Sequence, residues 1–209
     1  MLLLGIDTSG KTASVSVYDT TKELFLAQTS IYTKMTHSQV ILPLCKEVLT
    51  KSQLTLEDID EIAVAVGPGS YTGLRIGISA VKALCFGLDC KCDGVSTLLA
   101  MAYNNISYKG NICAIMSARN DLVYTALFRS DGYSIECIEE EKIVSHSELA
   151  EILAFSGSET LLCGDGCSPE SVVSRASQGY APSYNVVPNG EIDGNFKVLK
   201  FKLKIDEAW

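Results

Sequence analysis

The stretch GPGSYTGLRIG, residues 67–77, is a candidate phosphate-binding loop, because it holds four glycines and directly follows the apolar run IAVAV at 62–66. A P-loop requires G-x-x-x-x-G-K-[ST], in which the lysine reaches the phosphates. Here Gly67 and Gly73 are one residue too far apart, and Leu74 stands at the lysine position. The dinucleotide pattern G-x-G-x-x-G also fails, because Thr72 occupies the third glycine position. Neither phosphate-binding motif fits this loop.

Helix packing accounts for the same glycines better. Residues 68–72 predict a sharp turn that caps a helix over 73–88. Glycine within a helix costs about 1 kcal/mol relative to alanine, so it indicates the close approach of another backbone. That backbone belongs either to the chain's own sheet or to the helix of a partner. Arg75 lies off the small-residue face and is a candidate ligand for a carboxylate or phosphate. The small face comprises Gly73, Gly77, Ala80, Leu84 and Gly87.

A second candidate for phosphate binding is DTSGKTAS, residues 7–14, between two predicted strands. Backbone N–H groups and hydroxyls can hold anionic oxygens, and an aspartate can hold a hydrated cation. The nucleotide-binding candidates are therefore Asp7, Thr8, Ser9 and Gly10. The same pattern is common in ordinary turns, so its specificity is low.

The side chains that usually carry catalysis form no set in this sequence. The only two histidines are His37 and His146, and neither has a second histidine four residues later. The eight cysteines lack the paired C-x-x-C spacing of structural zinc sites, and most lie in apolar runs. The sequence therefore predicts reduced thiols, no metal site and no catalytic residues.

The elements that position these residues occur in the same succession twice. Strands over 2–7, 12–19 and 23–30 precede a helix over 36–52, a strand over 62–66 and the helix over 73–88. The second copy has strands over 111–119, 122–130 and 134–140, a helix over 145–157, and a strand and turn over 160–166. A helix over 96–106 joins the copies.

The repetition favours a duplicated α/β fold of the two-lobe actin/Hsp70-like type (ASKHA, ribonuclease H-like). The first lobe is predicted over 1–95 and the second over 96–209. The alternative is a succession that any α/β protein could show.

Charge and hydropathy limit the possible partners. The formal net charge of −8 argues against independent, high-affinity nucleic-acid binding, which depends on lysine and arginine at phosphates. The first apolar run stops at Asp7, too early for a secretory signal, and no run approaches the ~18 residues of a membrane span. The chain is therefore predicted to be cytoplasmic, without a membrane partner.

Several segments together resemble the bacterial TsaB (YeaZ) family. They are LLLGIDTSGKTASVSVYD, THSQVILPLCKEVL, IDEIAVAVGPGSYTGLRIGISAVKAL, GVSTLLAMA and SARNDLVYTALF. The pattern GPGS-[YF]-TG-[LV]-RIG is that family's most specific signature, and residues 67–77 match it in full. The resemblance covers about residues 1–130 and continues faintly to about 166.

This resemblance implies a role in forming N6-threonylcarbamoyladenosine at position 37 of ANN-decoding tRNAs. It also implies that the chain is not the enzyme. The transferase of the family's complex is the paralogue TsaD, which carries a metal-binding histidine pair, and TsaE, an ATPase, joins them. TsaD-like chains place two histidines four residues apart at the helix where Gln39, Val40 and Ile41 follow His37 here.

The resemblance also implies where the partner docks. In the family, the helices corresponding to 36–51 and 73–88 contact TsaD, or a second TsaB in a homodimer when TsaD is absent. No cofactor is intrinsic, although ATP or ADP can lie at the partner interface, and tRNA is reached only through the complex. The interface candidates are His37, Val40, Ile41, Leu44, Gly69, Tyr71, Gly73, Arg75, Gly77 and Ala80.

The end of the chain departs from the family, which usually closes with a helix and a P-x-Y-L-R-like tail. Here KFKLKID at 200–206 alternates like a strand, so the second lobe is predicted to be atypical from about residue 167. The departure concerns the packing of the second lobe, whereas the interface candidates lie in the first.

Three functions follow from the sequence. The leading hypothesis is a non-catalytic subunit of the tRNA-modifying complex. A small-molecule kinase or ATPase of the same superfold is the alternative, motivated by DTSGKTAS and the two Gly-x-Gly turns. A peptidase is the weakest hypothesis, because no Ser–His or Cys–His arrangement supports it.

Overall fold

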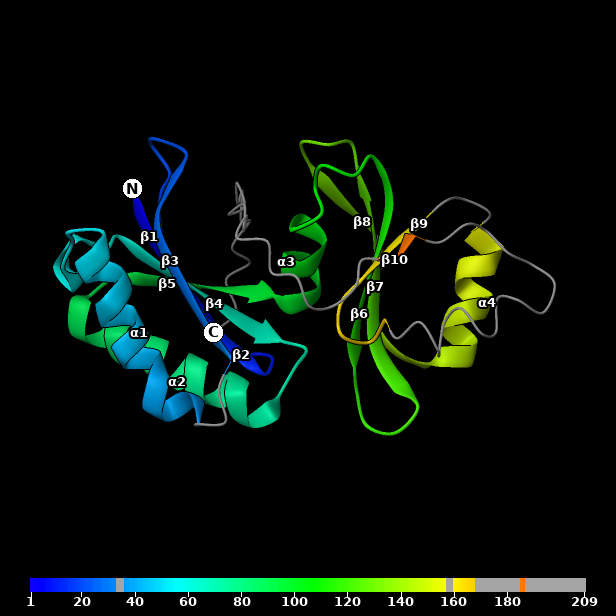
Figure 1. Ribbon diagram of the computed structural model, residues 1–209, viewed down its shortest axis with the longest axis horizontal. Coiled ribbons are helices and arrows are strands. Elements are labelled where there is room, and N and C mark those ends of the chain that lie inside the picture. The colour runs from blue at the N-terminus through cyan, green and yellow to red at the C-terminus, as the bar shows by residue number, and fades with distance from the viewer. Residues whose placement is uncertain (33–35, 157–159, 168–184, 187–209) are drawn as a thin grey trace.

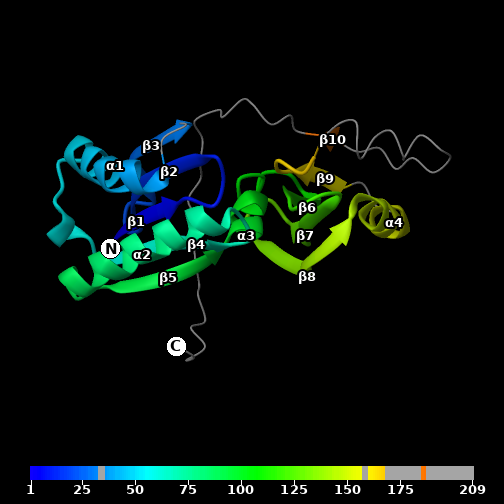
Figure 2. The same ribbon diagram turned by 90° about the horizontal axis from the view of Figure 1, so that it is seen from below.

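The computed structural model describes residues 1–32, 36–156, 160–167 and 185–186, and they form two lobes. Each lobe is built on a five-stranded sheet. The lobes lie side by side, with helix α3 between them in both views (Figures 1 and 2).

The first lobe is a mixed sheet covered on one face by two helices. β1 pairs antiparallel with β2 and parallel with β4, and the strand order is β3-β2-β1-β4-β5. The elements are β1 (Leu2–Asp7), β2 (Thr12–Asp19), β3 (Leu24–Tyr32), α1 (His37–Lys51), a 3-10 turn (Leu56–Asp58), β4 (Glu61–Gly67), α2 (Tyr71–Leu88) and β5 (Lys91–Ser96).

The core of this lobe lies between the sheet and helices α1 and α2. Alternate residues of the three central strands point into it, because successive side chains of a strand face opposite sides. The helical spacing of the apolar residues of α1 buries one stripe of that helix against the same face. The buried strand residues include Leu4, Ile6, Val15, Val17, Ile62 and Val64, and those of α1 are Val40, Ile41, Leu44, Cys45, Val48 and Leu49.

The second lobe repeats the strand pairing of the first. β6 pairs antiparallel with β7 and parallel with β9, and the strand order is β10-β9-β6-β7-β8. Its elements are α3 (Thr97–Tyr103), β6 (Gly110–Ser117), β7 (Leu122–Ser130), β8 (Ile135–Ser145), α4 (His146–Ser156), β9 (Thr160–Cys163) and β10 (Asn185–Val186).

Two separate clusters cover the two faces of the second sheet. Leu98 and Ala102 of α3 pack with Ile112 and Phe128 on one face. Leu149 and Leu153 of α4 pack on the other. α4 begins with the expected capping box, in which Ser145 N donates to Glu148 Oε2 at 2.8 Å and Glu148 N donates to Ser145 Oγ at 3.2 Å.

The two sheets have matching strand pairings, as the predicted duplication requires. Most predicted elements are present within a few residues of their expected ends, although α3 stops at Tyr103 and β8 continues to Ser145. The strands β5 and β10 were not predicted. The strand predicted over 200–206 lies outside the described residues. No helix among the described residues is long and apolar enough to cross a membrane.

Candidate functional site

The turn at the start of the GPGSYTGLRIG motif packs against the end of β1. Ser70 N donates to the Ser9 carbonyl oxygen at 2.7 Å, and Ser70 Oγ caps α2 by accepting from Gly73 N at 3.2 Å. A Cβ atom on Gly69 would lie 2.5 Å from the Ser9 carbonyl oxygen, so only glycine fits there. The turn and the β1–β2 hairpin are therefore joined backbone to backbone.

Gly73 and Gly77 continue this contact along α2. A Cβ atom on Gly73 would lie 2.1 Å from the Thr8 carbonyl oxygen, and one on Gly77 would lie 2.3 Å from Thr8 Oγ1. Thr8 Oγ1 donates to the Gly73 carbonyl oxygen at 2.8 Å. The close neighbour of Gly73 and Gly77 is thus Thr8, which directly follows the chain's own β1. Gly73 and Gly77 are both buried against the chain itself, and their contact with a partner stays a prediction.

The DTSG hairpin is held by the same contacts. Thr8 and Ser9 are both buried, and the Thr8 hydroxyl is engaged with the Gly73 carbonyl oxygen, so the role of these two residues in nucleotide binding stays a prediction. Asp7 Oδ1 accepts from Ser9 N at 2.8 Å, and the Gly10 carbonyl oxygen lies 2.9 Å from His37 Nε2. Asp7 and Gly10 are half-buried, and their nucleotide-binding role stays a prediction.

The second Gly-x-Gly turn, at 164–166, has the same packing role in the second lobe. A Cβ atom on Gly164 would lie 2.1 Å from the Ile115 carbonyl oxygen, which accepts from Gly166 N at 3.1 Å. Ser117 N donates to Asp165 Oδ1 at 3.0 Å. Both glycine turns therefore support their own β-hairpins, which removes one motive for the kinase or ATPase alternative.

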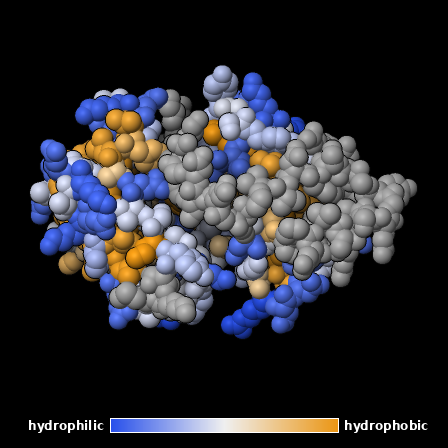
Figure 3. Space-filling model, viewed as in Figure 1, coloured by the Kyte–Doolittle hydropathy of each residue, from blue (hydrophilic) through white to orange (hydrophobic). Residues whose placement is uncertain are grey.

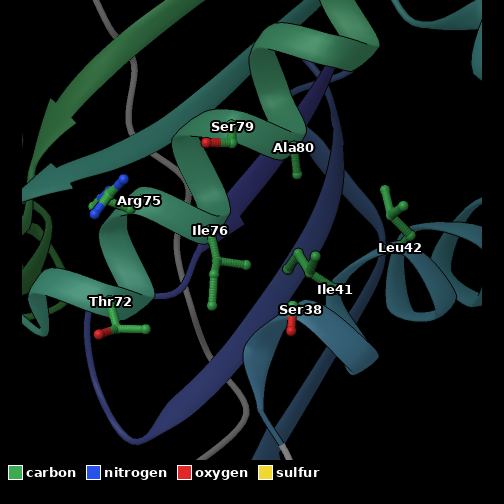
Figure 4. A pocket seen from close by; sticks show the side chains of 8 residues that line it. All are labelled: Ser38, Ile41, Leu42, Thr72, Arg75, Ile76, Ser79 and Ala80. Carbon is green, nitrogen blue, oxygen red and sulfur yellow. The ribbon is translucent and has the colours of Figure 1, made fainter.

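A groove of about 440 Å³ lies between α1 and α2 on the surface of the first lobe. Ile41 and Ile76 point toward each other across it, and Arg75 and Ser79 lie along its α2 edge (Figure 4). Hydrophobic colouring marks the place where the two helices meet (Figure 3). The groove is lined by Ser38, Ile41, Leu42, Thr72, Arg75, Ile76, Ser79 and Ala80.

The groove contains only some of the predicted interface residues. Ile41, Arg75 and Ala80 line it. Val40 and Leu44 belong to the lobe's own core and do not line the groove, and their contact with a partner stays a prediction.

The remaining interface candidates lie elsewhere. His37 packs against the β1–β2 hairpin through Gly10. Gly69 and Tyr71 line a second groove of about 560 Å³ between the lobes, where they face Tyr124 and residues 141–143. The Arg75 guanidinium lies 5.4 Å from the centre of the Tyr71 ring, a cation–π contact at the corner between the grooves.

Sequence reasoning missed five residues of the α1–α2 groove. It selected the apolar stripe of α1, which is the stripe that the chain buries against its own sheet. Leu42 was the available signal, since it is an apolar residue outside that stripe and is 52% exposed. The missed residues are Ser38, Leu42, Thr72, Ile76 and Ser79.

The electrostatics of the described residues favour inert thiols in the cores. Burial raises the pKa of Cys45 to about 12 and that of Cys113 to about 11, so both stay protonated at neutral pH. In the part of the chain that the structure describes, no three His, Cys, Asp or Glu side chains are placed to hold a metal ion.

Comparison with known protein sequences places these features in a family. Residues 30–173 match the family model described as TsaD: tRNA N6-adenosine threonylcarbamoyltransferase. The tRNA threonylcarbamoyladenosine biosynthesis protein TsaB of Bacillus subtilis is 32% identical over 168 residues, which cover 80% of this chain and 72% of that protein. The Escherichia coli protein of the same name is 35% identical over 152 residues, which cover 71% of this chain and 64% of that protein.

The chain is also similar to part of a transferase and to a solved structure. The tRNA N6-adenosine threonylcarbamoyltransferase of Symbiobacterium thermophilum is 40% identical over 96 residues, covering 43% of this chain and 28% of the transferase. The structure of YeaZ from Pseudomonas aeruginosa superposes with a TM-score of 0.75 at 24% identity, covering 89% of this chain and 83% of that one. This likeness confirms the predicted actin-like α/β fold.

Proposed function

The chain belongs to the TsaB (YeaZ) family of tRNA threonylcarbamoyladenosine biosynthesis proteins, and on this premise we propose that it is the non-catalytic scaffold subunit. In this role it docks a TsaD-like transferase through the groove between α1 and α2. The observation that carries the proposal is the surface of that groove, which pairs an apolar floor with an exposed polar edge.

The chemistry of the groove suits a protein partner. Leu42 exposes about half of its side chain beside the isoleucines of the floor, and burial of such surface supplies most of the free energy of association. Arg75 and the nearby hydroxyls offer hydrogen bonds at the edge. Arginine beside an aromatic ring, as at Arg75 and Tyr71, is a pair enriched among residues that dominate binding energy.

The likeness of this chain to part of a transferase supports the choice of partner. Two chains that share a similar lobe can pair through equivalent helices about a pseudo-two-fold axis, as identical subunits pair in a symmetric dimer. The same geometry accounts for a homodimer when the transferase is absent. A TsaE-like ATPase and the tRNA then join through the complex, and ATP or ADP binds only at the partner interface.

The contacts of His37 support a non-catalytic role. Its Nε2 atom lies 2.9 Å from the Gly10 carbonyl oxygen, so this nitrogen is engaged in holding the hairpin rather than facing a substrate. The resemblance implies a histidine pair at the corresponding helix of the transferase, whereas Gln39, Val40 and Ile41 follow His37 here. We place the proposed complex in the cytoplasm.

Leu42→Asp tests the docking surface. A carboxylate in the apolar floor should weaken association with the TsaD-like protein roughly thirtyfold or more, since removal of a central contact typically costs about 2 kcal/mol or more. Titration calorimetry measures the affinity, and threonylcarbamoyl transfer to tRNA by the mixture measures function. Both should fall together.

Leu24→Asp is the matched control, because Leu24 is 54% exposed on β3, away from the groove. It should bind the transferase as the unmodified chain does. Equal affinities for the two variants would exclude the groove as the docking site. A complex that forms normally but leaves transfer unchanged relative to the transferase alone would exclude the scaffold role.

A further inference from the structure

Three cysteines gather where α2 ends and β5 begins. Cys85 lies in the last turn of α2, Cys90 lies in the connection, and Cys92 lies on β5. The Sγ atoms of Cys85 and Cys90 are 3.6 Å apart, and Cys85 Sγ also lies 3.6 Å from the Lys91 carbonyl oxygen. The sulfur atoms of Cys85 and Cys90 are therefore in van der Waals contact.

The backbone at the helix end produces this contact. Asp89 has a left-handed conformation with φ 53° and ψ 39°, which is typical of the residue that ends a helix. The N–H groups of Asp89 and Cys90 both donate to the Cys85 carbonyl oxygen, at 3.3 Å for Cys90. The chain therefore folds back over the last turn, and the side chains of Cys85 and Cys90 are brought to the same place.

We propose that Cys85 and Cys90 are a reversible redox modification site, which hydrogen peroxide converts to an intramolecular disulfide. The Cys90 thiolate attacks one peroxide oxygen, giving a sulfenic acid, and the hydroxide that leaves takes up a proton to become water. Cys85 sulfur then attacks Cys90 sulfur, and the sulfenic hydroxyl leaves as water with the proton of Cys85. Two thiols lose two electrons and two protons, and one peroxide becomes two waters.

The burial of the two residues assigns the order in which their thiols react. Cys90 is half-buried and open to a small oxidant, whereas Cys85 is buried. Burial, together with the neighbouring sulfurs of Cys90 and Cys92, raises the pKa of Cys85 to about 12, so that it remains a thiol until the sulfenic acid forms beside it. Cys90 is thus the peroxide-reactive residue and Cys85 is the resolving residue.

The disulfide would close a short covalent loop around the end of α2. That loop contains Phe86, whose side chain is 92% exposed. A covalent link across a helix end suppresses its local opening, because the last turn can no longer separate from the following strand. Oxidation should therefore slow amide hydrogen exchange in residues 86–88.

Digestion with trypsin separates the possible products. Cleavage after Lys82 and Lys91 places Cys85 and Cys90 in one peptide, residues 83–91, and Cys92 in the next. After treatment of the full chain with hydrogen peroxide and alkylation, the 83–91 peptide should be lighter by a pair of hydrogens and carry no alkyl group. Dithiothreitol should restore two alkylated cysteines.

Cys90→Ser should leave Cys85 alkylated, and Cys92→Ser should leave the disulfide intact. Cys137, an exposed thiol on β8, reports the general level of oxidation. The proposal is overturned if 83–91 keeps both thiols while Cys137 is oxidised, or if 83–91 is joined to the peptide of Cys92. If residues 86–88 of the oxidised chain exchange their amide hydrogens as fast as in the reduced chain, the disulfide does not stabilise the end of α2.

Discussion

At the residue scale, the glycines of α2 serve different purposes although they share one helix. Gly73 and Gly77 lie against Thr8, where a side chain has no room. Gly87 is exposed, and a Cβ atom there would meet nothing within 4 Å. Gly73 and Gly77 permit α2 to approach β1. Gly87 destabilises the helix relative to alanine and permits no close contact.

We therefore expect opposite effects from two identical substitutions. Gly77→Ala should lower the free energy of unfolding by about 2 kcal/mol, because its Cβ overlaps Thr8 Oγ1 and forces the helix off the sheet. Gly87→Ala should raise it by up to about 1 kcal/mol through helix propensity. Urea denaturation followed by circular dichroism measures both.

A double substitution identifies the cause. Thr8→Ala removes the hydroxyl that Gly77 faces, so Gly77→Ala should cost less in that background than in the unmodified chain. Gly73→Ala should not be rescued in this way, because its clash is with the Thr8 carbonyl oxygen. Equal costs of Gly77→Ala in both backgrounds would show that the packing contact does not explain the glycine.

At the element scale, neighbouring strands can hold groups that titrate together. Glu61 of β4 and Asp93 of β5 lie on adjacent parallel strands, with Glu61 opposite Lys91 and Ala63 opposite Asp93. A hydrogen bond with the Asp93 side chain, partial burial and the charge of Asp93 raise the pKa of Glu61 to about 7, while Lys91 opposes this rise. The folded chain therefore holds a proton here that the unfolded chain has lost at neutral pH.

The pH dependence of stability follows from this upward shift of the Glu61 pKa. The contribution of Glu61 is fully present below its ordinary pKa of 4.5 and is lost as pH rises through about 7. Glu61→Gln removes the loss, so at about pH 8 the variant should be more stable by about 1 kcal/mol, after allowance for solvent screening of this partly exposed pair. Near pH 5 the two proteins should unfold alike.

Denaturant titrations at both pH values measure this difference. Glu57→Gln, which removes an exposed carboxylate from the 3-10 turn, is the charge control and should show no such pH-dependent gain. A constant difference between Glu61→Gln and the unmodified chain at both pH values would exclude a shared proton between β4 and β5.

The elements also show what sequence patterns capture. Strands with alternating or continuous apolar residues, such as β4 and β6, were predicted because their burial leaves a pattern. β5 has the sequence KCDGVS and exposes much of its length, so only its pairing with β4 makes it a strand. The small-residue face of α2 was also predicted, because its residues recur at helical spacing. That spacing alone does not say whether the face packs on the chain itself or on a partner.

At the scale of the whole molecule, the chain is two similar lobes with separate cores. The core of the first lobe contains only residues that precede β5 or lie close to its start. Leu98 and Ala102 of α3 belong instead to the core of the second lobe. The junction is Ser96, whose hydroxyl accepts from Leu99 N at 3.2 Å to cap α3 and also bonds to Glu141 of β8. The proposed docking groove lies wholly within the first lobe.

A fragment of residues 1–96 should therefore fold by itself and bind the transferase. We expect one cooperative thermal transition, because its core is complete without the second lobe. Its affinity for the TsaD-like protein should lie within about tenfold of that of the full chain, since little of the groove depends on distant elements. Calorimetry supplies both measurements.

A fragment of residues 1–103 is the control, because it adds α3 without the sheet that buries Leu98 and Ala102. Its exposed apolar face should promote self-association, which sedimentation velocity detects. If instead 1–103 is monomeric and 1–96 unfolded, α3 is required by the first core and the lobes are not independent. If 1–96 folds but does not bind, the partner must contact the second lobe, and docking through the α1–α2 groove alone is excluded.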